Sequence, residues 1–373
     1  MEKRNKTELR FMLAAIALIY VAVFVLEQTM NPSHILFTVL KKGAIYSLVA
    51  VSMNLLNGFT GLFSLGQAGF MLIGAYTYAI FTIPTEVKLS DSVYKYYDCL
   101  VTFDTGIFIA LLCAGLAAGL FAALIGLPVL RLKSDYLAIA TLGFAEIIRA
   151  IFQWDTLGPI TNGANVMREY KDLTDVTIPF TGIKFPPTLF VFLAAGACVA
   201  LIVLLINSSY GRAFKAIRDD EIAAEAMGIN LFKHKQMSFV ISSFFAGVSG
   251  ALVAMFQATV QASQFKSAMT YEILLIVVIG GIGSVSGSCI ASFLYIASSE
   301  WWLRGLDSGK FLWIVAPTIF RSGFRKFAFS IVIMIIVLFF SRGLMGDKEI
   351  SFRGLARKLK SRPAKAKGGE TDA

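Results

Sequence analysis

Long stretches of the sequence contain no Asp, Glu, Lys or Arg, and they include residues 43–85, 105–130, 185–211, 236–265, 273–299 and 327–341. The hydrocarbon core of a bilayer needs about 20 apolar helical residues per crossing, each rising about 1.5 Å. Several stretches meet this length alone. Lipid satisfies no backbone hydrogen bonds, so only helices or a closed barrel can span it, and uninterrupted apolar runs favour helices. The sequence therefore predicts an all-α fold, a polytopic transmembrane helical bundle.

The charged residues gather between these stretches and at the chain ends. A formal net charge of +10 can suggest a nucleic-acid partner, but this placement is the positive-inside pattern of membrane proteins, so we expect none. The start, "MEKRNKTELR", resembles that of a signal peptide, yet no small-residue cleavage site follows Leu26. We therefore expect 11–26 to remain as a first helix. The tail from Arg342 carries nine Lys or Arg against four acids, which predicts that both termini are cytoplasmic.

The apolar pattern predicts about ten membrane segments. The first six are expected at 11–26, 35–57, 62–83, 106–130, 136–153 and 187–207. One straight helix over 270–300 would be about 46 Å long, too long for a core of about 30 Å. Splitting it at "GGIGSVSG" (280–287) and ending with 327–341 gives an even count of ten, as two cytoplasmic termini require. Lys41 and Lys42, near the outer end of the second segment, do not fit this topology.

The prediction divides the chain into a transmembrane domain over 1–346 and a disordered basic cytoplasmic tail over 347–373. Two glycine-rich breaks, "GFTGLFSLGQAGF" (58–70) and 280–287, interrupt membrane segments in the two halves of this domain. Such paired breaks indicate a substrate path, because irregular backbone is tolerated where it lines a cavity. Close packing of helices through small residues explains them as well. Candidate path residues are Ser64, Gln67, Gly281, Gly283 and Ser286.

Glu146 and Arg149 lie within the predicted fifth segment and share one helix face, since they are three residues apart. Ionisable residues inside a membrane are a functional hypothesis, because exposing them to lipid is costly. The pair fits contact with the two ends of a zwitterionic substrate, or gating of a path. It fits equally a mutually neutralising pair that locks the bundle, or one near the outer surface.

The sequence carries few signals of catalysis. It has two histidines, His34 and His234, which leaves no zinc cluster and little basis for a Ser-His-Asp triad. "GPITNGAN" (158–165) has the glycine spacing of a phosphate-binding loop but lacks its lysine and hydroxyl residue. We therefore expect no enzyme activity and no cofactor bound by this chain.

The stretch "GRAFKAIRDDEIAAEAMGI" (211–229) places seven charged residues between two apolar runs. Asp219 or Asp220 can cap the N-terminus of a new helix, and Gly228 can end it in a left-handed conformation. The remaining two turns, about 221–227, are too short to be stable without packing. Ala223, Ala224 and Met227 supply a small apolar face. The stretch is therefore either a helix that docks into a partner or a solvated connection.

Five motifs resemble the branched-chain amino-acid permeases of ABC importers, in the same order. They are "GLFSLGQAGFMLIGAY" (61–76), "SDYLAIATLGFAEIIR" (134–149), "YGRAFKAIRDDEIAAEAMGIN" (210–230), "VIGGIGSVSG" (278–287) and "SRGLMG" (341–346). The resemblance covers about 40–346. The additional N-terminal helix makes the chain similar to the longer of that family's two permease types. Gln67 stands where the family usually has histidine, which leaves the substrate open.

The resemblance implies a subunit that transports rather than catalyses. Its partners would be a second, shorter permease in a heterodimer, two cytosolic ATPase subunits that use ATP and Mg²⁺, and an extracytoplasmic binding protein. It would lie in a bacterial or archaeal plasma membrane. The loop 208–236 would be the coupling loop, in which ATP-driven closure of the ATPases moves a short helix. The coupling residues would be Arg212, Arg218, Asp219, Asp220, Glu221, Ala223, Ala224 and Gly228.

Two further functions stay open from the sequence. Permeases similar to this family handle urea or short amides instead of leucine, isoleucine and valine. A different class, an ion-coupled secondary transporter, would use Glu146 and Arg149 as coupling groups and would need no ATPase.

Overall fold

A computed structural model describes residues 6–31, 34–89, 99–132, 134–177 and 184–302, with short pieces at 93–94, 96–97, 310–311, 314–315, 330–331, 334 and 343–346. Apart from scattered bridges and an antiparallel pair of two-residue strands, β1 (Lys310–Phe311) and β2 (Ile314–Val315), this part is helical, which confirms the all-α fold. The predicted final crossing, 327–341, lies largely outside the described residues, and the tail 347–373 lies wholly outside them.

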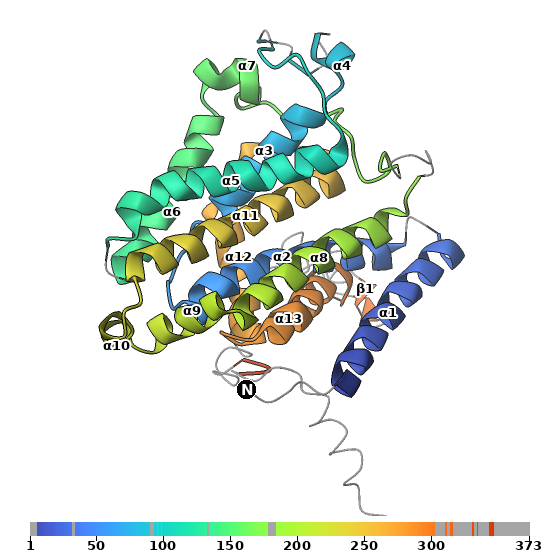
Figure 1. Ribbon diagram of the computed structural model, residues 1–373. Helices are drawn as coiled ribbons and strands as arrows, with labels where there is room; N and C mark the ends of the chain where they lie inside the picture. The colour runs from blue at the N-terminus through green and yellow to red at the C-terminus, as the bar shows by residue number, and fades with distance from the viewer. Residues whose placement is uncertain are drawn as a thin grey trace, which may run out of the picture.

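The elements follow one another as in Figure 1. The long helices are α1 (Lys6–Thr29), α2 (Ile35–Asn54), α5 (Ile107–Val129), α6 (Ser134–Phe152), α8 (Pro187–Asn207) and α11 (Leu231–Gln257). The shorter helices are α3 (Gln67–Thr82), α4 (Thr85–Leu89), α7 (Gly158–Thr161), α9 (Ser209–Asp219), α10 (Glu221–Ala226), α12 (Ser267–Gly280) and α13 (Val285–Ala297). Single turns are the π-helical η1 (Leu55–Phe59) and η4 (Ser298–Trp302) and the 3-10 helical η2 (Asp155–Leu157) and η3 (Ala262–Gln264).

Four helices of the described part are long and apolar enough to cross a membrane: α2 continued by η1, α5, α8 and α11. A fifth candidate is α6 with the segment 155–161, which bends away from it by 63°. The predicted third segment, 62–83, is shorter as a helix, because α3 begins only at Gln67. The predicted split of 270–300 is present, since α12 and α13 are separate helices. The count of ten segments stays a prediction.

Helix α3 is buried within the bundle, where α11, α5 and α6 pack against it. Nearly all of its residues are buried, as expected for a helix that is apolar on every side. Its contact with α11 is close because glycines replace side chains where the two backbones meet. A methyl group on Gly74 would overlap the backbone of Gly247, and one on Gly250 would overlap that of Met71. This close approach is the usual device of membrane helices, which gain little from the hydrophobic effect in lipid.

Helix α5 shows how a membrane helix orients when all its faces are apolar. Its fully buried face is a row of alanines four residues apart: Ala110, Ala114, Ala118 and Ala122. Its exposed face is a parallel row of leucines: Leu112, Leu116, Leu120 and Leu124. Small residues therefore face the neighbouring helices, and large ones face outward, where lipid can surround them.

The loops after the third and fifth predicted segments, which a cytoplasmic N-terminus places outside, lie together at one end of the bundle. Leu100 N donates a hydrogen bond to Pro159 O (3.0 Å), and Tyr94 Oη donates to Ile160 O (2.9 Å). The Lys171 ammonium donates to Asp104 Oδ2 (3.2 Å) and holds the pKa of that carboxyl below its usual value. A lowered folded-state pKa means that this bridge stabilises the loops above the ordinary carboxyl pKa and is lost as pH falls through the lowered one.

The lysines that did not fit the topology have partners in the fold. Lys42 Nζ lies 2.6 Å from Glu300 Oε1, and Lys41 Nζ lies 5.9 Å from the ring centroid of Phe256. Ionisable residues at membrane depth pair in this way because lipid exposure is costly. Their position in the second segment is therefore explained by tertiary pairing, and it does not require a reversed topology.

The first helix, α1, is held to α8 by polar contacts. Glu27 Oε1 accepts from Thr188 N (2.8 Å) and Oε2 accepts from Leu189 N (3.2 Å), so the carboxylate caps the N-terminus of α8. Tyr20 Oη donates to Phe192 O one turn further along (3.0 Å). The segment 11–26 is thus part of a helix that belongs to the bundle.

The α3–α11 contact generates a prediction about stability. Gly74→Ala must push two helix backbones apart, and overpacking of this kind costs about 1–3 kcal/mol. We expect a lower melting temperature for the purified variant in detergent. Gly143→Ala is the matched control, because nothing lies near the added methyl group there. If both variants melt like the unaltered protein, the close approach does not hold these helices together.

Candidate functional site

The short helix predicted between the apolar runs is present as α10, which projects beyond the ends of α8 and α11 (Figure 1). Asp220 caps it, because its Oδ1 accepts from Ile222 N (2.9 Å) and from Ala223 N (3.0 Å). Gly228 follows its C-terminus at φ +84°, a left-handed conformation that favours glycine. Both caps are confirmed, with Asp220 rather than Asp219 as the N-terminal one.

The surface of α10 differs from the predicted one in one respect. Ile222 and Met227 are 82% and 83% exposed, whereas Ala224 is only 4% exposed because it faces the body of the protein. Ala224 was predicted to belong to the docking face, and that is wrong for the chain as it is folded here. Ile222 was missed, because six residues of sequence do not show which side of a helix faces the protein. Ala223 is exposed, as predicted.

The charged residues around α10 tie it to its neighbours. Lys235 on α11 lies 2.7 Å from Glu221 Oε2. Arg218 Nη2 donates to Asp219 Oδ1 (2.9 Å), while its Nη1 donates to Gly58 O (3.1 Å). Arg212 contacts its own helix, since Nη2 donates to Ser209 Oγ (2.9 Å). Of the predicted coupling cations, Arg218 therefore reaches inward to the first glycine break, and Arg212 stays on the surface.

The first glycine break is an irregular stretch with its backbone satisfied by side chains. The π-helical η1 ends α2, and 61–66 then run without helical hydrogen bonds to α3. Ser64 N donates to Asn57 Oδ1 (3.1 Å), and Leu65 N donates to Thr141 Oγ1 (2.9 Å). Ser64 itself is buried.

Gln67, at the start of α3, joins the core beside this break. Its Nε2 donates to Ser242 Oγ (2.9 Å), and that hydroxyl donates to Ser52 O (2.6 Å). The next residue, Ala68, donates its N–H to Thr270 Oγ1 (3.2 Å). The predicted path residue Gln67 therefore bridges α3 to α11 and α2 in a buried polar network.

The second break, 281–284, joins α12 to α13. Gly281 and Gly283 have φ values of +111° and +91°, which side-chain-bearing residues rarely adopt. Ser284 caps α13, since its Oγ accepts from Gly287 N (3.1 Å), and Ser286 Oγ lies 3.4 Å from the same hydroxyl. The break is thus a sharp reversal between two helices.

Glu146 and Arg149 lie on α6, the helix against which Gly69 of the first break packs. Arg149 Nε donates to Glu146 Oε2 (2.7 Å), as the spacing predicts, and Arg149 Nη1 donates to Gln153 Oε1 (3.2 Å). The other oxygen, Oε1, accepts from Ser267 N (3.1 Å) and from the Ser267 hydroxyl. Ser267 is the first residue of α12. The pair therefore fastens α6 to the N-terminus of α12, which favours the locking interpretation.

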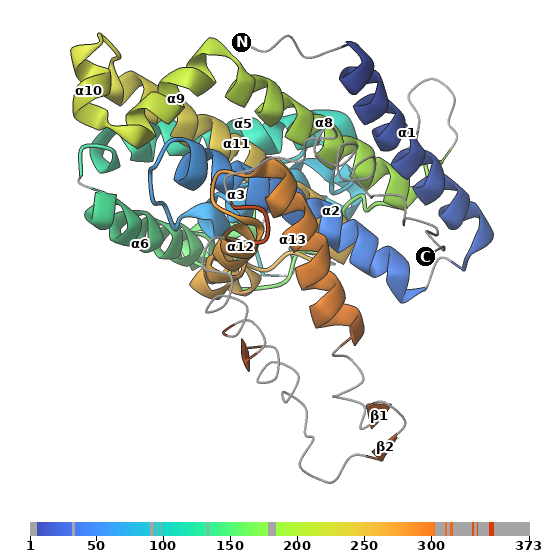
Figure 2. The same cartoon turned by 90° about the horizontal axis from the view of Figure 1, so that it is seen from below.

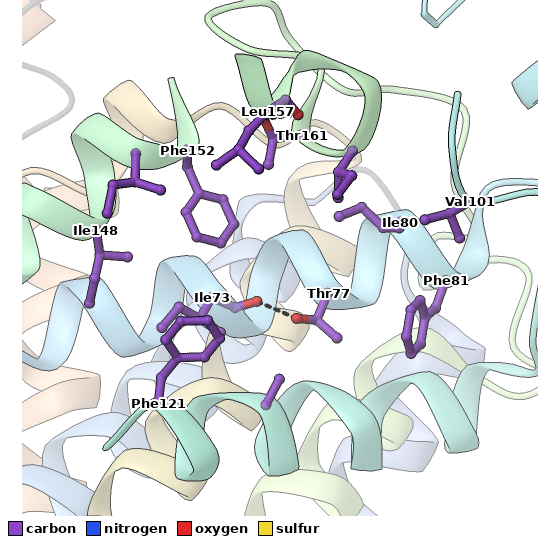
Figure 3. A pocket seen from close by; sticks show the side chains of 13 residues that line it. Ile73, Thr77, Ile80, Phe81, Val101, Phe121, Ile148, Phe152, Leu157 and Thr161 are labelled. Carbon is purple, nitrogen blue, oxygen red and sulfur yellow. Dashed lines mark hydrogen bonds between the residues drawn. The ribbon is translucent and has the colours of Figure 1, made fainter. Parts of the chain in front are cut away.

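A cavity of about 380 Å³ lies among α3, α5, α6 and α7 (Figure 3). Its lining is apolar except for two threonines, and Thr77 Oγ1 already donates to Ile73 O (2.7 Å). None of the predicted path residues lines it. The lining offers no charged or amide group, so it cannot hold the ends of a zwitterion.

The matching family and the similar known proteins all carry the same description, that of branched-chain amino acid transport permeases. Residues 35–341 match the family described as "Branched-chain amino acid transport system / permease component". The chain is 35% identical, over 278 residues, to the high-affinity branched-chain amino acid transport system permease protein LivM of Escherichia coli, covering 69% of this chain and 61% of that one. It is 22% identical to the probable LivM of Methanocaldococcus jannaschii, in a match that covers 84% of this chain and 94% of the relative. It is 24% identical to the probable LivH of that organism, covering 80% and 89%. No solved structure matches.

The contacts of Glu146 generate a prediction. Glu146→Ala removes the acceptor from the N-terminus of α12, and loss of such a cap costs about 1 kcal/mol. We expect a lower melting temperature, with a smaller loss in Glu146→Gln, because the amide oxygen can still accept from Ser267 N. Glu86→Ala, at an exposed position on α4, is the control. Equal melting temperatures for Glu146→Ala and the unaltered protein would contradict a capping role.

Proposed function

This chain belongs to the family of branched-chain amino-acid transport permeases, and from that premise we propose that it is the membrane-spanning subunit of an ATP-driven importer. It moves branched-chain or other hydrophobic amino acids into the cell by alternating access. Its matched region spans 61% of the length of each of the two bacterial LivM relatives. Activity, substrate and partners are therefore argued from its own residues.

The observation that carries the proposal is the geometry of α10. Exposed Ile222 and Met227 give a projecting, doubly capped helix an apolar tip at the end of the bundle. Solvent-exposed isoleucine and methionine on so short a helix indicate an interface, because apolar anchors in a partner's pocket carry most binding energy. The sequence contains no phosphate-binding loop of its own. The partner is therefore an ATPase subunit that supplies the work.

The mechanism follows from how α10 is attached. Closing of two cytosolic ATPase subunits around ATP and Mg²⁺ displaces the docked helix. The Asp220 cap and the Glu221–Lys235 ion pair keep α10 rigid relative to α9 and α11, so the displacement passes into the membrane helices. This chain then rocks against a second, shorter permease, and the pair opens inward or outward.

The remaining partners and the location follow from this assignment. An extracytoplasmic binding protein delivers substrate to the end of the bundle opposite α10, where the loops around Tyr94 and Pro159 gather. The complex lies in the plasma membrane of a bacterium or archaeon, with both termini of this chain in the cytoplasm and about ten membrane segments.

The substrate class is the least constrained part of the proposal. The relatives' names specify branched-chain amino acids, whose side chains are apolar and whose backbone ends are charged. The apolar cavity beside α3 contains no group that holds those charged ends, so the path runs elsewhere, along the contact with the second permease. Urea or a short amide is the alternative cargo.

The proposal is tested with the full complex in proteoliposomes. We expect ATP-dependent uptake of labelled leucine that a proton ionophore does not abolish, with excess leucine, isoleucine or valine competing and urea failing to compete. Ile222→Asp places a charge in the apolar tip of α10, so the ATPases should no longer co-purify and uptake should be lost. Leu100→Asp, at an exposed position on the opposite end, should retain the ATPases.

Two outcomes would overturn the proposal. Uptake that persists without the ATPase subunits and collapses with the proton gradient would identify a secondary transporter. Competition by urea or acetamide, without competition by leucine, would identify the amide-transporting relatives.

The left-handed turn after α10 gives an independent prediction. Gly228→Val places a β-branched residue at φ +84°, which distorts the turn although no neighbouring atom blocks the side chain. We expect ATP hydrolysis to continue while uptake per ATP falls. Gly228→Asn is the matched control, because asparagine tolerates left-handed dihedrals. Equal loss in both variants would show that the backbone conformation is not the reason.

A further inference from the structure

Four segments that are far apart in the sequence meet at the end of α2. They are η1 with the first glycine break, the second break at 281–284, the last turn of α9, and the turn 343–346. Figure 2 shows α12 and α13 beside α2, and both helices contact it. The residue at the centre of this junction is Asn54, the last residue of α2.

The Asn54 side chain is fully buried (0% exposed), and its donors and its acceptor are all used. Nδ2 donates to Ser284 O (2.9 Å) and to Ser288 Oγ (2.9 Å). Oδ1 accepts from Gly283 N (2.8 Å). These partners are the irregular backbone of the second break and the first turn of α13. One amide therefore replaces the helical hydrogen bonds that the break lacks, as a buried backbone requires.

The two breaks also touch directly. A methyl group on Gly58, in η1, would overlap Asn54 Oδ1 and would come within 2.5 Å of Gly283 N. Glycine at 58 and 283 therefore lets the two backbones approach with only the Asn54 amide beside them. The turn 343–346 is fastened to the same place, since Leu344 N donates to Ile279 O (2.7 Å).

Helix α9 reaches this junction from the α10 side. Arg218 Nη1 donates to Gly58 O (3.1 Å), and Lys215 Nζ lies 5.5 Å from the ring centroid of Phe59. Gly61, at φ +76°, brings the first break against the Arg218 side chain. Arg218 directly precedes the two residues that lead into α10. The last turn of α9, next to α10, therefore contacts the first break directly through Arg218. It is connected to the second break through η1 and Asn54.

We propose that Asn54 and Arg218 are the positioning residues that connect α10 to both glycine breaks. Arg218 passes the movement of α9 to η1, and Asn54 clamps η1 to the second break, so the two breaks move together. Both breaks lack a regular helical ladder and are the compliant points of their segments, and π-helical turns occur frequently at functional sites. This role rests on the proposed ATP-driven function.

Coupling is tested by the ratio of uptake to ATP hydrolysed, measured on equal amounts of the assembled complex. Asn54→Asp keeps the size and the acceptor of the side chain and removes the Nδ2 donor. Arg218→Gln shortens the side chain and removes the hydrogen bond from Nη1 to Gly58 O. We expect ATP hydrolysis to persist in both and uptake per ATP to fall about fivefold or more, the usual scale of coupling between sites.

Two matched variants control for the chemistry of the substitutions. Asn207→Asp changes an exposed asparagine, at the end of α8, that contacts only its own helix through Val203 O. Arg131→Gln changes an exposed arginine in the turn after α5, outside the coupling loop 208–236. Both controls should keep the uptake-to-ATP ratio of the unaltered complex.

An unchanged ratio in Asn54→Asp and Arg218→Gln would overturn the inference. So would parallel losses of uptake and hydrolysis in proportion to the assembled complex, because that result indicates a purely structural role. If Asn54→Asp does not assemble, Arg218→Gln decides alone, since it lies on the outside of the junction. Absence of ATP-dependent uptake in the unaltered complex would instead refute the proposed function.

Discussion

The constraint on which this structure depends is that a backbone surrounded by lipid must satisfy its hydrogen bonds within the protein. Regular helices do so without help. Each glycine break gives up helical hydrogen bonds, and side chains from other elements replace them. Asn57 and Thr141 accept from the first break, and Asn54 both donates to and accepts from the second. Buried polar residues such as Asn54 and Thr141 therefore lie beside the points where the helices are interrupted.

The same constraint explains how the helices pack. The hydrophobic effect does not drive helices together inside a membrane. Their association depends instead on close backbone contact and on buried hydrogen bonds. The alanine row of α5 and the glycines between α3 and α11 provide the first. The Ser52–Ser242–Gln67 network provides the second. Next to this packing, the first break contacts α9, since Arg218 donates to Gly58 O, and the second break contacts the first.

Sequence patterns predicted those parts of the fold whose cause is local. Helix α8 was predicted with its observed bounds, and α5 and α6 within two residues, because each apolar run ends at charged or turn-forming residues. The caps of α10 followed from Asp220 and Gly228, whose preferences act within three residues. The third segment was predicted to start too early, since 62–66 are apolar but extended, and only contacts with α6 and α12 show why.

Among the functional residues as well, some features follow from the local sequence and others depend on tertiary contacts. The sequence by itself determined that the chain is an apolar helical bundle with two glycine breaks and one capped polar helix, because composition and short-range preferences fix these features. Only the tertiary structure decided that Ala224 faces inward, that Ile222 faces outward, and that Arg218 points to Gly58. It alone brought Asn54 to Gly283, which is 229 residues away. An asparagine in an apolar run gives no local sign of its partner, because that partner is chosen by how distant helices pack.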